Sequence, residues 1–134
     1  MATVALTKDT FDKTVQDNDT VIVDFWAEWC GPCRSFAPTF EAASNQHEDI
    51  VFAKVDTEDQ QELATQFGIR SIPTLMVFRD QIVLYSQPGA LPAPAFIDLV
   101  DQVKVLDMDD VRAQMAAHEA SEEHDHDHEV EHAG

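Results

Sequence analysis

Runs of apolar, β-branched and aromatic residues mark the predicted strands of the first hundred positions. The run 21–26 reads Val-Ile-Val-Asp-Phe-Trp, and similar runs occupy 50–56 and 74–78. Runs that are apolar at nearly every position are typical of strands buried on both faces of a sheet. A short apolar segment at 4–6 and a less apolar segment at 81–86 predict two further strands, the second at the edge of a hairpin.

Apolar residues at helical spacing predict helices between these strands. The predicted helices cover 7–16, about 31–47, 57–67 and 93–103. Thr57 and Gln60 have the spacing of a capping box at the start of the third helix. Alternating strands and helices, followed by a hairpin and a last helix, predict an α/β fold with a central mixed sheet and helices on both faces.

The composition changes near residue 117, where large apolar side chains become rare. Residues 104–134 hold ten acidic and two basic residues, together with five of the six histidines. We interpret 1–103 as a folded domain, 104–117 as the place of an extra helix that Asp107 caps, and 118–134 as a disordered acidic tail.

Length and charge exclude several classes of protein. A chain of 134 residues is enough for one domain, and its net charge of −18 disfavours nucleic acid and anionic membranes as partners. Two cysteines exclude a scaffold with several disulfides, and no apolar run reaches the ~18 residues of a membrane span. The first 14 residues lack the pattern of a signal peptide, so we expect the protein in the cytoplasm.

Cys30-Gly31-Pro32-Cys33 lies where a strand is predicted to pass into a helix. Backbone N–H groups and the helix dipole at that place favour the thiolate of Cys30, the reactive form. The spacing brings Cys33 close enough to form a disulfide with Cys30, so the pattern indicates dithiol–disulfide exchange. The alternative is half of a zinc site, but the domain offers no second pair of ligands.

Asp24 interrupts an apolar strand six residues before Cys30. Burial raises the pKa of a carboxyl group, which would suit a group that accepts the proton of Cys33. The alternative is an aspartate that reaches solvent at the strand end. Lys54 occupies the matching position of the next strand and either pairs with Asp24 or extends to the surface.

Pro73 opens a buried strand, where its missing N–H is tolerated. A cis bond before Pro73 would shape a loop that faces the cysteines, although a trans bond is the usual case. Of the two tryptophans, Trp29 is the better candidate for a binding surface because it precedes Cys30, whereas Trp26 suits the core.

These motifs together resemble the thioredoxin family. The run 23–33, Val-Asp-Phe-Trp-Ala-Glu-Trp-Cys-Gly-Pro-Cys, is similar to the signature of that family. Lys54-Val55-Asp56, the segment 68–74 and Gly89-Ala90 recur at the separations usual in it. The resemblance covers about residues 3–103.

The resemblance implies a five-stranded mixed sheet flanked by four helices. It makes Cys30 the exposed nucleophile, Cys33 the buried resolving thiol, Asp24 a proton relay with Lys54 as its partner, and Ile72–Pro73 a cis peptide. It also implies a groove for target polypeptides, lined by Trp29, Gly31, Pro32, Ile72, Pro73, Gly89 and Ala90. A thioredoxin reductase using NADPH would recharge the protein, which needs no bound cofactor, and we expect a monomer.

Two segments depart from the family pattern. The last hairpin has Arg79-Asp80-Gln81 in place of a turn with glycine, so we expect a longer turn or one of another type. The tail carries His124, His126 and His128 between acidic residues. These side chains can bind Zn²⁺, Ni²⁺ or Cu²⁺, but the composition favours a solvated acidic tail over a metal site. The extra segment also keeps open an alternative function, a chaperone-like or scaffold binding module.

Overall fold

The computed structural model describes the backbone of residues 2–133 and the side chains of residues 2–120. The chain divides into two compact units, one ending at Asp98 and the other beginning at Leu99. The first unit holds the sheet and the cysteines, and each unit is described by itself.

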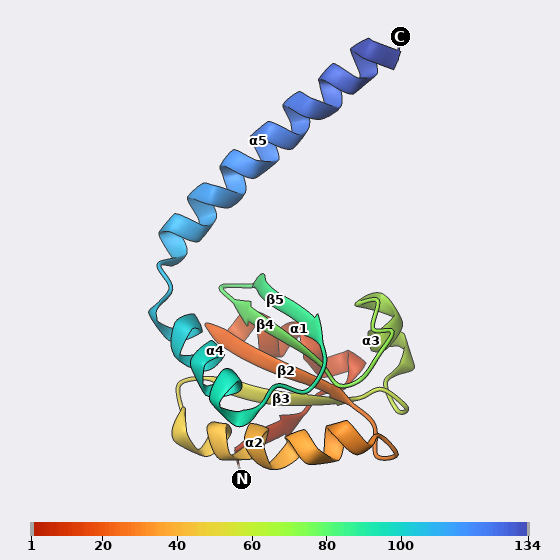
Figure 1. The fold of residues 1–134 in the computed structure, drawn as a ribbon, viewed down its shortest axis with the longest axis vertical. Helices are drawn as coiled ribbons and strands as arrows, with labels where there is room; N and C mark the ends of the chain where they lie inside the picture. Colours follow the sequence, from red (N-terminus) through yellow and green to blue (C-terminus); the bar gives the residue numbers. More distant parts are fainter. Residues whose placement is uncertain (1, 134) are drawn as a thin grey trace. The chain divides into compact units, whose positions relative to one another are not determined.

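Five strands and the helices between them build the first unit (Figure 1). Its elements are β1 Thr3–Ala5, α1 Lys8–Asp17, β2 Thr20–Trp26, α2 Gly31–Gln46, β3 Val51–Asp56, α3 Gln61–Gln66, β4 Thr74–Arg79 and β5 Ile82–Pro88, and α4 Ala93–Val105 begins in it. The sheet order is β1-β3-β2-β4-β5. β3 runs parallel to β1 and β2, whereas β4 pairs antiparallel with β2 and β5. The predicted five-stranded mixed sheet is therefore confirmed.

One face of the sheet packs against α1 and α3. Alternate residues of β2, beginning with Val21, point to this face and join a core cluster with Phe11 of α1 and Leu63 of α3. The ring centroid of Phe11 lies 4.9 Å from that of Phe67 and 5.7 Å from that of Phe78. The apolar face of α1 therefore anchors the helix by burying aromatic area.

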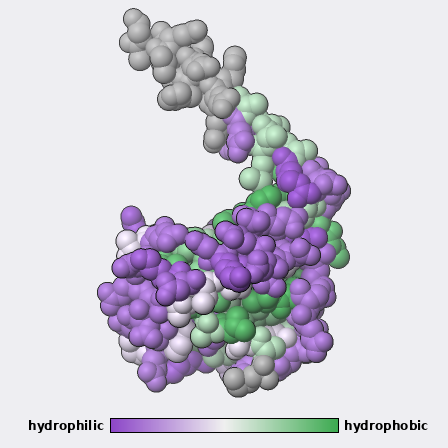
Figure 2. All heavy atoms as spheres, turned by 180° about the vertical axis from the view of Figure 1, so that it is seen from behind, coloured by the Kyte–Doolittle hydropathy of each residue, from purple (hydrophilic) through white to green (hydrophobic). Residues whose placement is uncertain are grey.

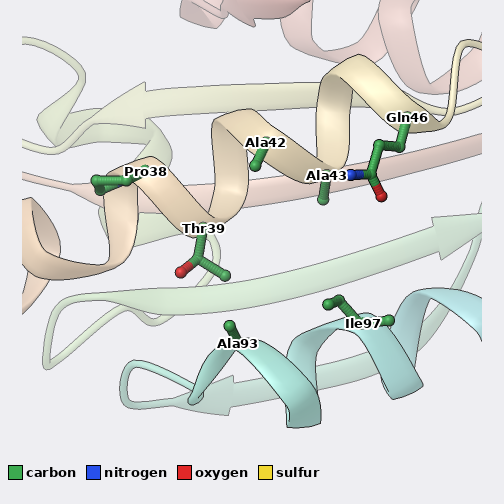
Figure 3. A pocket seen from close by; sticks show the side chains of 7 residues that line it. All are labelled: Pro38, Thr39, Ala42, Ala43, Gln46, Ala93 and Ile97. Carbon is green, nitrogen blue, oxygen red and sulfur yellow. The ribbon is translucent and has the colours of Figure 1, made fainter.

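The opposite face packs against α2 and the start of α4. The ring of Phe40 in α2 lies 5.4 Å from that of Phe52 in β3 and 5.8 Å from that of Phe96 in α4. Between the two helices remains an apolar hollow of about 260 Å³ (Figure 3), lined by Pro38, Thr39, Ala42, Ala43, Gln46, Ala93 and Ile97. Hydrophilic residues cover most of the surface displayed in Figure 2, with apolar patches between them.

The helix predicted at 57–67 is present but starts later than predicted, and its capping box is wrong. Residues 57–59 form a turn, and α3 begins only at Gln61. The Thr57 hydroxyl donates to the carbonyl of Trp26 at 3.0 Å, and the Gln60 side chain accepts the N–H of Lys8 at 2.9 Å. Both side chains bind groups on neighbouring elements, so neither is available to cap α3.

The hairpin between β4 and β5 turns in two residues. Arg79 pairs with Ile82, and Asp80 and Gln81 adopt φ values of 52° and 67°. Two consecutive residues with positive φ make the tight turn that matches the twist of a hairpin. The turn is therefore not longer than usual, although neither position carries the glycine that this conformation favours.

The second unit contains α5, Met108–Ala133. The Asp107 carboxylate accepts the N–H groups of Asp109 at 3.0 Å and Asp110 at 3.3 Å, so the predicted cap is confirmed. The helix continues through most of the region whose composition predicts a disordered tail. That tail stays a prediction, because the side chains from residue 121 on lie outside the described residues. Within the described part of the chain, no helix is both long and apolar enough to cross a bilayer.

The turn predicts a stabilising substitution. Gln81→Gly removes an unfavourable left-handed conformation that costs about 1–2 kcal/mol in L-residues, and the greater freedom of glycine in the unfolded chain offsets part of this gain. We expect a net gain of about 1 kcal/mol, or a rise in Tm of roughly 3–5 °C by calorimetry. Gln81→Ala serves as the control and should give no rise, and equal Tm values for the two variants would contradict the explanation.

Candidate active site

The junction between β2 and α2 positions the two cysteines. β2 ends at Trp26, and Cys30 is the N-cap of α2. Pro32 lies in the first turn, where its missing N–H leaves no hydrogen bond unmade. The Cys33 N–H donates to Cys30 Sγ at 3.2 Å, so the sulfur takes the place that a capping oxygen usually has. A negative charge on this sulfur would meet the positive end of the helix dipole.

Cys30 and Cys33 form a disulfide, with their Cα atoms 5.3 Å apart. The exposed fractions of the two residues are 4% and 3%. The expectation that Cys30 is exposed is therefore wrong for this oxidised form, because its sulfur packs beneath the neighbouring loop. Their surroundings still differ, since Cys30 follows the exposed Trp29 whereas Cys33 lies one turn inside α2.

The loop before β4 covers the disulfide. The Ile72–Pro73 peptide is cis, as the resemblance implied. The Ile72 carbonyl oxygen lies 3.7 Å from Cys30 Sγ, and the Ile72 side chain packs against the cysteine pair. The Gly89 N–H donates to the Pro73 carbonyl at 2.8 Å. Two segments that are distant in sequence from the cysteines are thus brought together beside them.

The predicted groove residues differ in exposure. Trp29 has 66% of its surface exposed. The other exposed members are Gly31, Pro32, Gly89 and Ala90, while Ile72 is half-buried and Pro73 is buried. A large exposed indole beside a reactive sulfur offers apolar area to a partner polypeptide.

Asp24 lies inside the sheet with no exposed surface. Neither of its carboxylate oxygens has a hydrogen-bond partner within the described residues. Burial raises the pKa of Asp24 from 3.8 to about 7, and the positive charge of Lys54 opposes that rise. The alternative interpretation of Asp24, as a strand-end residue in contact with solvent, is therefore wrong.

Lys54 stands beside Asp24 in the register of β2 and β3, as expected. Its Nζ lies 4.6 Å from the ring centroid of Trp26, a cation–π arrangement. The lysine is half-buried, so its charge is felt by the carboxyl without a direct bond between the two side chains.

The sequence reasoning missed Glu58, whose Oε1 accepts the indole N–H of Trp29 at 2.6 Å. The carboxyl ends of parallel strands meet at one edge of a sheet, and Glu58 and Trp29 each follow such a strand. That placement was a usable signal, but the prediction of a helix at 57–67 concealed it.

Among residues 2–120, no three His, Cys, Asp or Glu side chains lie close enough together to hold one metal ion. The weaker candidates for metal binding, His124, His126 and His128, have side chains outside the described residues.

Comparisons with known proteins agree with this geometry. The family model of thioredoxin matches residues 2–102. The chain belongs to the thioredoxin family. A protein of Streptomyces coelicolor provisionally named thioredoxin 2 is 56% identical over 119 residues, covering 89% of each chain. Thioredoxin 1 of Synechococcus elongatus is 42% identical over 100 residues, covering 73% of this chain and 94% of its own.

The fold comparison gives the same family. A mutant thioredoxin from Halobacterium salinarum superposes with a TM-score of 0.73 at 33% identity, covering 78% of this chain and 93% of its own. Membership of this family and the bonded cysteine pair together establish the activity of a thiol–disulfide oxidoreductase. Because the family model ends at residue 102, a similarity over 119 residues to the Streptomyces protein must include part of 103–134.

The raised pKa of Asp24 predicts how stability depends on pH. The folded state holds the proton more tightly than the unfolded state, so stability falls as pH rises from about 4 to about 7. Asp24→Asn has no charge to bury. In the oxidised protein, this variant should gain on the order of 4 kcal/mol relative to wild type across that interval and no more above it.

Urea unfolding of wild type and Asp24→Asn at a series of pH values measures the difference directly. Burying the amide of Asp24→Asn also changes the free energy of unfolding, but by an amount that does not vary with pH, because an amide does not titrate. A difference between the two proteins that stays flat from pH 4 to 8 would contradict the pKa assignment.

Proposed function

We propose that Cys30 and Cys33 reduce the disulfides of other proteins by two successive exchanges. The Cys30 thiolate attacks one sulfur of the target disulfide, which breaks and releases its other sulfur as a thiolate. Cys33 then attacks Cys30 Sγ, closes the Cys30–Cys33 bond and releases the second target sulfur. Two electrons pass to the target, whose sulfurs take up two protons. The bond that Cys30 and Cys33 form within the first turn of α2 carries this proposal.

Asp24 accepts the proton of Cys33 when that thiol attacks, and Lys54 moderates its charge. A pKa of about 7 leaves the carboxyl group divided between its two forms near neutral pH. A group in that condition can both take and release a proton, which is what a general base requires in each cycle. Its position on β2, the strand that leads to the cysteines, supports the assignment.

Targets bind across an apolar surface around the cysteines. Its members are Trp29, Gly31, Pro32, Ile72, Pro73, Gly89 and Ala90. Two observations support this surface: Trp29, next to Cys30 in the chain, is largely exposed, and Gly89 is bonded to Pro73 in the loop whose Ile72 carbonyl lies 3.7 Å from Cys30 Sγ.

A reductant must return the disulfide to the dithiol after each cycle. A thioredoxin reductase supplies these electrons from NADPH, and the domain itself holds no cofactor. The protein acts as a monomer in the cytoplasm. Its net charge of −18 keeps it from nucleic acid and anionic membranes, so its partners are the reductase and disulfide-bearing proteins.

Turnover with NADPH, a thioredoxin reductase and insulin as target tests the function. Wild type should oxidise NADPH steadily. Cys30→Ser should lower the rate to background because no mixed disulfide can form. Cys33→Ser should instead accumulate a mixed disulfide through Cys30, visible by non-reducing electrophoresis, because the resolving thiol is absent.

Undiminished turnover in Cys30→Ser would contradict the mechanism, and so would a mixed disulfide that accumulates through Cys33 in Cys30→Ser and not through Cys30 in Cys33→Ser. A wild type that gives no turnover but still suppresses aggregation of unfolded protein would favour the chaperone-like binding module instead.

A further inference from the structure

Trp29 is the most exposed large side chain at the cysteines, yet it is not left to rotate. Its indole N–H donates to Glu58 Oε1 at 2.6 Å. A hydrogen bond to a charged acceptor is short and comparatively strong, so it favours one orientation of the ring. Ordering a side chain before a partner arrives removes part of the entropy cost of binding.

Glu58 can hold the ring only if its own backbone is fixed, and the turn after β3 fixes it. The Asp56 carboxylate accepts the Glu58 N–H at 2.9 Å, and the Gln60 N–H donates to the Asp56 carbonyl at 2.8 Å. The backbone N–H and the hydroxyl of Thr57 both donate to the Trp26 carbonyl, at 2.9 and 3.0 Å. The turn is therefore bound to itself and to β2.

The far end of the turn is attached to α1. The Lys8 N–H donates to the Gln60 side chain at 2.9 Å, and the Lys8 ammonium pairs with Glu62. The ion pair is exposed and contributes little by itself. The backbone bond is the firmer link, and it ties the start of α1 to the start of α3. Glu58 thus extends from a segment that is held on both sides.

We propose that Glu58 is a positioning residue for target binding, which it serves by holding the Trp29 ring beside Cys30. This inference rests on the proposed role of Trp29 as a target contact. Glu58 touches neither sulfur, so its loss leaves the exchange step unchanged and weakens the encounter with the target. We expect KM to rise roughly three- to tenfold, because the variant loses one hydrogen bond and must immobilise one more side chain when the target binds.

Steady-state reduction of insulin, recycled with dithiothreitol, separates KM from kcat in four variants. Glu58→Ala should raise KM by this factor with kcat unchanged. Glu58→Gln keeps an acceptor oxygen and should restore a KM close to that of wild type. Asp59→Ala removes a carboxylate from the same turn without touching Trp29, so it is the charge-matched control and should behave as wild type. Trp29→Phe keeps a ring without the N–H, and should reproduce Glu58→Ala.

A double-mutant cycle shows whether Glu58 acts through Trp29. In the Trp29→Phe background, Glu58→Ala should add nothing further. An unchanged KM in Glu58→Ala, additive effects in the double variant, or an equal loss in Glu58→Gln and Asp59→Ala would each overturn the proposal. Trp29→Phe measures the same effect without altering the turn, should Glu58→Ala fail to fold.

Trp29→Ala distinguishes this inference from the function on which it rests. If Trp29→Ala raises KM while Trp29→Phe and Glu58→Ala do not, the ring binds targets but Glu58 does not position it. If Trp29→Ala leaves KM unchanged, the role of Trp29 in target binding is wrong, and the inference about Glu58 is overturned with it.

Discussion

The placement of Cys30 as the N-cap of α2 is the constraint around which the site is arranged. β2 must end within the sheet and α2 must begin shortly after it, so that Cys30 Sγ receives the Cys33 N–H. The same turn of helix brings Cys33 into bonding distance. The loop with Ile72 then closes over the sulfur. The site is therefore a property of one strand-to-helix junction, and the rest of the fold holds that junction in place.

Asp24 is the position at which the sheet departs from the pattern that stabilises it. All the other residues of β2 from Val21 to Phe25 are fully buried apolar side chains, and a carboxyl among them loses its hydration without gaining a hydrogen bond within the described residues. Lys54 offsets part of that cost through its charge. A local rule broken at large cost, next to a redox pair, is typical of a residue kept for chemistry rather than for stability.

Hydrophobic periodicity predicted most of the strands and helices, and the motifs predicted most of the site residues. The buried run of β2, the cysteine pair and the Asp24–Lys54 register could all be predicted, because each depends on near neighbours or on simple strand pairing. The turn at 57–59 could not be predicted, because Thr57 and Gln60 satisfy their side chains on elements that are distant in sequence. Local capping propensity competes with such tertiary partners and is often overridden. The burial of Cys30 likewise depends on a loop some forty residues away.

The central claim is that Cys30, and not Cys33, makes the first attack. Limited alkylation of the reduced protein with iodoacetamide at neutral pH, followed by peptide mapping, measures this directly. The helix N-terminus and the position beside Trp29 predict label on Cys30 well before Cys33. Equal labelling of the two cysteines, or earlier labelling of Cys33, would contradict the account.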